Sequence, residues 1–138
     1  MGPSYNHAYI HAKLIGALLK VGTYSVFSEL TLDIDGADHV PDISLYPKRT
    51  INRLDDVIRV SEMPLLAVEI LSPTQGTWDV LKKFKVYFQA GVKSCWLVEP
   101  VTSAVVVCSA PGRARTFVED EIVDETLGLR VPIKEIFE

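Results

Sequence analysis

The chain has 138 residues, 48% of them hydrophobic and 9% aromatic, which predicts one globular domain over residues 1–138 and excludes an intrinsically disordered protein. The formal net charge of −4 arises in residues 119–138, which hold seven acidic and two basic side chains, so the overall composition gives nucleic-acid binding no support. No apolar run approaches the ~18 residues that a membrane-spanning helix needs and no signal-peptide pattern opens the chain, so we expect a cytoplasmic protein without a membrane partner.

The first half of the chain predicts a helix followed by a β-hairpin. Residues 5–20 carry apolar side chains at helical spacing and precede Gly22, as expected for an amphipathic helix that ends there. Residues 23–34 alternate between apolar and polar as a strand does, the sequence "DGAD" signals a turn, and residues 39–46 predict the returning strand. Residues 47–63 are polar and predict irregular structure.

The second half predicts a buried strand, a helix and a group of further strands. Residues 64–72 are almost all apolar, which is typical of a central strand covered on both faces. The remaining predicted elements are a helix over 75–90, strands over 94–100, 103–110 and 113–119, and a short closing helix over 132–138. This order predicts an α/β fold in which helices flank a mixed central β-sheet.

Glu69 is the unexpected residue of the apolar strand. A carboxylate inside a sheet is costly unless a cation or a metal ion balances it. Asp42 begins the returning strand of the hairpin, so the two carboxylates can face one spot if the two strands are neighbours. Two carboxylates suit Mg²⁺ or Mn²⁺, since Mg²⁺ keeps several waters and accepts oxygens from substrate phosphates.

The hairpin loop decides which residues lie near Asp42. If Gly36 and Ala37 form the centre of the loop, the numbers of facing residues sum to 73 and Glu29 faces Ser44. Glu29 and Asp42 are then diagonal neighbours on one face of the sheet, about 7–8 Å apart. This register makes Glu29 a candidate member of the same site.

A lysine of the second helix is the candidate for stabilising negative charge. Asp79, Lys83 and Tyr87 follow one flank of the helix at four-residue steps, and Lys85 lies on the opposite flank. Either lysine can reach round the edge of the sheet to orient water or stabilise an oxyanion, and the helical wheel does not choose between them. Asp79 and Lys83 also form an ordinary helix-stabilising pair, and Tyr87 can equally be a packing residue.

These residues together resemble the bacterial putative restriction-endonuclease family of the PD-(D/E)XK nuclease superfamily. The stretches that carry the resemblance are "VPDISLY", "LAVEILSPT", the helical residues just named, "AGVKSCWLVEP" and "GLRVPIKEIFE". The likeness covers nearly the whole chain. It implies a restriction-endonuclease-like core, DNA as the partner, Mg²⁺ or Mn²⁺ as the cofactor and a possible homodimer.

The resemblance also implies a role for each site residue. Asp42 and Glu69 correspond to the two metal-binding acids, and Glu29 corresponds to an upstream acid that assists them. The usual lysine position is occupied by Leu71, and the resemblance implies that the lysine has moved to Lys83 in the helix. The candidate supporting residues near this centre are Asp79 and Tyr87 of the helix and Ser72, which can hold a metal-bound water.

Other interpretations of single residues and of the whole chain stay open at this stage. Ser72 can simply cap the second helix. His7 and His11 have the i,i+4 spacing of a zinc helix, but they lack the intervening glutamate and an evident third ligand. The functional expectation is a metal-dependent endonuclease that hydrolyses DNA phosphodiester bonds. The alternative is a catalytically inactive nuclease fold used as a binding or assembly module, which the acidic balance favours.

Overall fold

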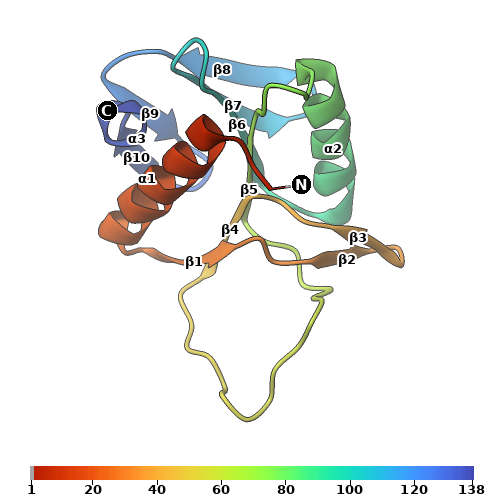
Figure 1. Ribbon diagram of the computed structural model, residues 1–138. Coiled ribbons are helices and arrows are strands. Elements are labelled where there is room, and N and C mark those ends of the chain that lie inside the picture. Colours follow the sequence, from red (N-terminus) through yellow and green to blue (C-terminus); the bar gives the residue numbers. More distant parts are fainter. Residues whose placement is uncertain (1) are drawn as a thin grey trace.

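A six-stranded mixed sheet forms the centre of the computed structural model, which describes residues 2–138 (Figure 1). Its strand order is β1-β4-β5-β6-β7-β8; β5 and β6 are parallel, and the other neighbouring pairs are antiparallel. The elements are α1 (Tyr5–Val21), β1 (Tyr24–Ser28), β2 (Leu32–Ile34), β3 (Ala37–His39), β4 (Ile43–Pro47), β5 (Leu66–Ile70), α2 (Thr77–Ala90), β6 (Ser94–Glu99), β7 (Ala104–Ala110), β8 (Arg113–Phe117), β9 (Glu121–Asp124), β10 (Leu129–Pro132) and α3 (Lys134–Phe137). The predicted α/β fold with a mixed central sheet flanked by helices is confirmed.

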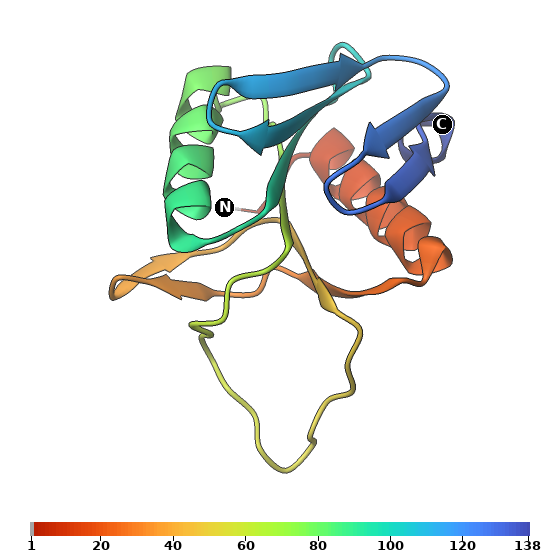
Figure 2. The ribbon, with the colours of Figure 1, turned by 180° about the vertical axis from the view of Figure 1, so that it is seen from behind.

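The two faces of the sheet carry separate layers. Helix α1, the β9–β10 hairpin and α3 cover one face, and α2 with the β2–β3 hairpin covers the other. Figures 1 and 2 show α1 and α2 on opposite sides of the strands. Strand β5 is buried on both faces, with Val68 in the α1 layer and Ala67 in the α2 layer. This double cover is the physical reason for its nearly continuous apolar sequence.

Local sequence signals explain where the two long helices begin and end. Ser4 caps α1, because its Oγ accepts a hydrogen bond of 3.2 Å from the His7 backbone N–H. Helix α2 begins after Gly76, whose N–H donates to Asp79 Oδ2 at 3.4 Å. The interpretation of Ser72 as the cap of this helix is therefore wrong. Gly91 ends α2 with φ +111°, a conformation that favours glycine.

The predicted hairpin register is wrong by two residues. Asp35 and Gly36 form the turn with φ values of +53° and +84°, so the numbers of facing residues sum to 71. An Asp-Gly pair is the preferred two-residue hairpin turn because both positions need positive φ. Glu29 therefore faces Asp42, and its N–H donates to the Asp42 carbonyl at 3.0 Å. Both long predicted strands are interrupted around this pair, and Glu29 itself has φ +52°.

The C-terminal part contains a hairpin that the sequence interpretation did not include. Strands β9 and β10 pair antiparallel and pack under the sheet beside α1. Asp124 of β9 is buried and accepts hydrogen bonds from Ser94 Oγ and, at 2.8 Å, from Trp96 Nε1 of β6. A charged residue in a core position hides the strand pattern, because the expected apolar alternation fails there.

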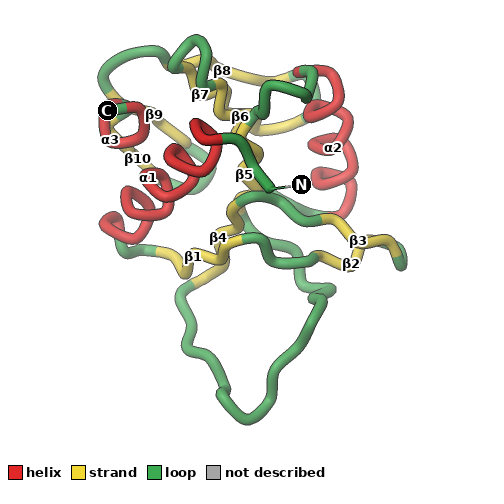
Figure 3. Tube along the Cα trace, in the orientation of Figure 1, coloured by secondary structure: helices red, strands yellow, loops and turns green. Residues whose placement is uncertain are grey.

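Segment 48–65 joins β4 to β5 without a helix or a strand, as predicted, and projects from the sheet in Figure 3. Leu54 in this segment is 98% exposed. Within residues 2–138, no helix combines the length and the apolar character needed to cross a membrane.

Asp124→Ala should destabilise the fold without affecting the candidate site described below. The substitution leaves the buried Trp96 N–H and Ser94 hydroxyl without their acceptor, which we expect to lower the free energy of unfolding by about 3 kcal/mol in urea titrations. The neighbouring Glu125 is exposed, so Glu125→Ala should stay within about 0.5 kcal/mol of the parent. Equal stabilities of the two variants would contradict the anchoring role of Asp124.

Candidate active site

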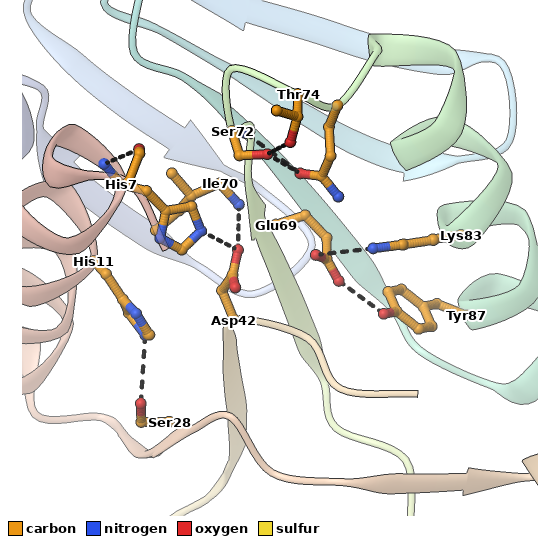
Figure 4. A network of polar contacts seen from close by, with 12 residues as sticks. His7, His11, Ser28, Asp42, Glu69, Ile70, Ser72, Thr74, Lys83 and Tyr87 are labelled. Atoms are coloured by element: carbon orange, nitrogen blue, oxygen red, sulfur yellow. Dashed lines mark hydrogen bonds and ion pairs between the residues drawn. The ribbon is translucent and has the colours of Figure 1, made fainter. Parts of the chain in front are cut away.

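Strand pairing places Asp42 level with Glu69. Strands β4 and β5 are antiparallel, with Ile43 facing Val68 at the last pair of the ladder. One step further along this register, Asp42 stands opposite Glu69. The start of β4 and the end of β5 lie at the same edge of the sheet, so both acids are there, as the sequence predicted for neighbouring strands. Figure 4 shows Asp42 between α1 and β5, and Glu69 turned toward α2.

Two side chains of α2 converge on the Glu69 carboxylate. Tyr87 Oη donates a 2.8 Å hydrogen bond to Glu69 Oε2, and Lys83 Nζ lies 3.8 Å from Oε1 (Figure 4). Val80 and Phe84 fix the helix in the core and so point this flank toward β5. The structure thus chooses between the two lysines that the helical wheel left open: Lys83 reaches Glu69, whereas Lys85 is exposed to solvent.

Glu69 carries a strongly perturbed carboxyl group. Its residue is only 4% exposed, and burial is the main cause that raises its pKa to about 7. The negative charge of Asp42 raises this pKa further, while Lys83 and Tyr87 act in the opposite direction. Burial, and secondarily the charge of Glu69, also raise the pKa of Tyr87, so Tyr87 keeps its proton and acts as a donor. The pair of acids therefore forms a local excess of negative charge.

Asp42 has a partner that the sequence interpretation missed. Its Oδ2 accepts a 2.7 Å hydrogen bond from the Ile70 backbone N–H and lies 3.2 Å from His7 Nε2 (Figure 4). His7 was considered only with His11 as a zinc-like pair, yet His11 contacts Ser28 Oγ at 3.4 Å instead. The contact between His7 and Asp42 spans 35 positions of the chain, and no local sequence pattern signals it.

The remaining predicted residues lie farther out. Glu29 is exposed and its backbone N–H pairs with the Asp42 carbonyl, while its proposed metal contact stays a prediction. Ser72 Oγ lies 3.3 Å from Gln75 Oε1 in the segment between β5 and α2. The Asp79 carboxylate accepts from the Gly76 N–H at the start of α2, and Lys83 turns to Glu69 rather than pairing with Asp79. The structure therefore brings together Asp42, Glu69, Lys83 and Tyr87 and places Ser72 and Asp79 at the helix entrance.

The donor set suits a divalent cation bound by few protein ligands. Within the described residues, no group of three or more His, Cys, Asp and Glu side chains is arranged to hold a metal ion. Mg²⁺ is commonly bound by one or two carboxylates and completes its shell with water and phosphate oxygens. Asp42 and Glu69 fit this donor chemistry. Burial and, secondarily, the negative charge of Asp42 raise the pKa of Glu69, and a cation would offset both effects.

Comparisons with known proteins identify the family and the fold. The sequence profile of the Uma2 family, described as "Putative restriction endonuclease", matches residues 1–134, which confirms the resemblance seen in the sequence. A putative nuclease belonging to DUF820 from Anabaena variabilis ATCC 29413 matches 99% of this chain and 83% of its own chain, with a TM-score of 0.82 and 22% identity. This likeness confirms the fold.

A second solved structure, a DrdV–DNA complex, is far less similar. It matches 94% of this chain and 12% of its own, with a TM-score of 0.41 and 11% identity. No curated protein matches the sequence.

Glu69→Gln should remove a pH-dependent loss of stability. Because the pKa of Glu69 rises from 4.5 to about 7 on folding, the folded protein keeps this proton where the unfolded chain has lost it. Glu69 therefore contributes most to the free energy of unfolding below pH 4.5. The parent loses about 3 kcal/mol of this stability as the pH rises to about 7.

Urea unfolding in metal-free buffer at several pH values checks this expectation. The amide oxygen that the substitution introduces can still accept from Tyr87, so Glu69→Gln should be more stable than the parent at pH 8. Glu119 is an exposed acid, so Glu119→Gln should lose stability with rising pH as the parent does. The same decline in Glu69→Gln would show that another group causes it.

Proposed function

The chain belongs to the Uma2 family of putative restriction endonucleases, and on this premise we propose that it is a metal-dependent nuclease that hydrolyses phosphodiester bonds of DNA. The observation that carries the proposal is the buried Glu69 carboxylate, which lies level with Asp42 and faces Lys83. Metal-dependent hydrolysis of a phosphodiester uses a cation site, and a fixed positive charge beside it stabilises the charge that develops on phosphate. These three residues supply both within a rigid strand and helix.

Each residue of the centre has a proposed role. Asp42 and Glu69 hold Mg²⁺ or Mn²⁺, and Glu29 assists from the exposed edge of the site. When bound there, such an ion polarises a phosphoryl oxygen and offsets the negative charge of the phosphate. Lys83 is 40% exposed at its side chain, so its ammonium group can contact both Glu69 and a substrate. It orients the attacking water and stabilises the charge that develops on the phosphate oxygens.

Tyr87 fixes the direction of the Glu69 carboxylate. Its hydroxyl donates to Oε2, which leaves Oε1 facing Lys83 and open to a cation. Because the ring is buried in the α2 layer, it cannot turn away without loss of packing. Cutting both strands of a duplex suits two such centres, so we include a homodimer in the proposal, together with a cytoplasmic location.

A cleavage assay on plasmid and single-stranded DNA in Mg²⁺ or Mn²⁺ tests the proposed reaction. Lys83→Ala should lower the rate of cutting at least about 100-fold, because it removes the only α2 ammonium group near Glu69 within the described chain. Lys85→Ala is the matched control, since Lys85 is an exposed lysine of the same helix, and it should cut like the parent. Equal cutting by parent and Lys83→Ala would remove Lys83 from the mechanism.

Metal binding separates a nuclease from a non-catalytic binding module. The parent should gain thermal stability in Mg²⁺, and Asp42→Ala should lose this gain because one of the two ligands is gone. The measurement is the melting temperature with and without the ion, compared with Glu119→Ala as an exposed control acid. Absence of any Asp42-dependent shift, with no cutting by the parent, would favour the binding or assembly module.

A further inference from the structure

We propose that His7 is a positioning residue that locks the Asp42 carboxylate and so presents its second oxygen, Oδ1, to the cation. This inference rests on the metal centre proposed above. It assigns a function to the first turn of α1, which supplies no ligand in that proposal. His7 acts through Asp42 and is not itself a ligand.

The contacts of Asp42 show that two hydrogen-bond donors hold one of its carboxylate oxygens, Oδ2. Oδ2 accepts from the Ile70 N–H at 2.7 Å and faces His7 Nε2 at 3.2 Å. A carboxylate oxygen only accepts, so the hydrogen of this contact belongs to Nε2 of His7. Two donors from two different elements, β5 and α1, then occupy the lone pairs of Oδ2. Oδ1 keeps its lone pairs and its direction is fixed by the same two bonds.

The imidazole ring is well placed for this role because it cannot move easily. His7 is 8% exposed, and its backbone N–H is held by the Ser4 cap at 3.2 Å. The edge of the His11 ring packs against it with a centroid distance of 5.9 Å. Burial and the His11 contact favour the ring orientation that holds Asp42.

The second ring nitrogen decides between a positioning residue and a metal ligand. His7 Nδ1 is buried and has no hydrogen-bond partner among residues 2–138. With the hydrogen on Nε2, Nδ1 is a bare acceptor, which is tolerated more readily than an unpaired donor. A ligand role would move the hydrogen to Nδ1, where a buried N–H would lack the acceptor that metal-bound histidines ordinarily have.

The two roles predict different metal selectivity. An imidazole ligand favours Mn²⁺ over Mg²⁺, so its removal would change the ratio of the two affinities. Loss of a residue that only orients Asp42 removes no ligand atom, so it weakens the binding of both ions by a similar factor. Calorimetric titration of the full chain with Mg²⁺ and with Mn²⁺ therefore distinguishes the roles without any measurement of activity.

We expect His7→Leu to lower both affinities about 10–100-fold, the usual effect of removing a hydrogen bond to a metal ligand. His7→Gln should recover much of the loss, because its amide N–H can reach toward Oδ2 as Nε2 does. Asn6→Leu is the matched control in the same turn of α1, since Asn6 is exposed, and it should bind both ions like the parent. Urea unfolding in metal-free buffer establishes that each variant is folded.

Nitrogen-15 NMR of the parent provides a second readout. The hydrogen should stay on His7 Nε2 when Mg²⁺ is added. Parent-like affinities in His7→Leu would overturn the positioning role, and so would a changed Mn²⁺ to Mg²⁺ ratio or loss of the Nε2 hydrogen on binding. A parent that binds neither ion would overturn the proposed metal centre itself, a result distinct from the others.

Discussion

The buried Glu69 carboxylate beside Asp42 is the interaction on which the rest of the site depends. Pairing of β4 with β5 puts two acids level at one edge of the sheet, and burial there raises the pKa of Glu69. Each helix layer supplies a partner for one acid. Helix α2 gives Tyr87 and Lys83 to Glu69, and α1 gives His7 to Asp42. The two acids are therefore oriented from opposite faces of the sheet.

Chain topology explains why a lysine of a helix can serve this site. Helix α2 begins a few residues after β5 and crosses back over the sheet before the parallel strand β6. Its flank thus runs past the end of the strand that carries Glu69. Leu71, where the resemblance places the usual lysine, packs instead at the margin of the α2 core. A lysine on a packed helix is held on a rigid base, as a precise site requires.

Local sequence patterns predicted the helices and the central strand with its buried Glu69, because helical spacing and apolar runs are visible in neighbouring residues. The choice of Lys83 needed either the family resemblance or the packing of α2. The hairpin register was wrong because Asp35 and Gly36 make a better turn than the residues first assumed. The buried charge of Asp124 interrupted the apolar pattern of β9, so that strand was not predicted. The contact of His7 with Asp42 joins elements that lie far apart in the sequence. Such long-range contacts depend on tertiary packing, which one sequence does not reveal.

The most direct test is the titration of the Glu69 carboxyl carbon by ¹³C NMR, in metal-free buffer and in saturating Mg²⁺. If the two acids form a cation site, the pKa of Glu69 is about 7 without the ion and falls well below that with it, because the cation stabilises the charged form. A pKa that does not change when Mg²⁺ is added would contradict the central claim that Asp42 and Glu69 bind a metal ion together.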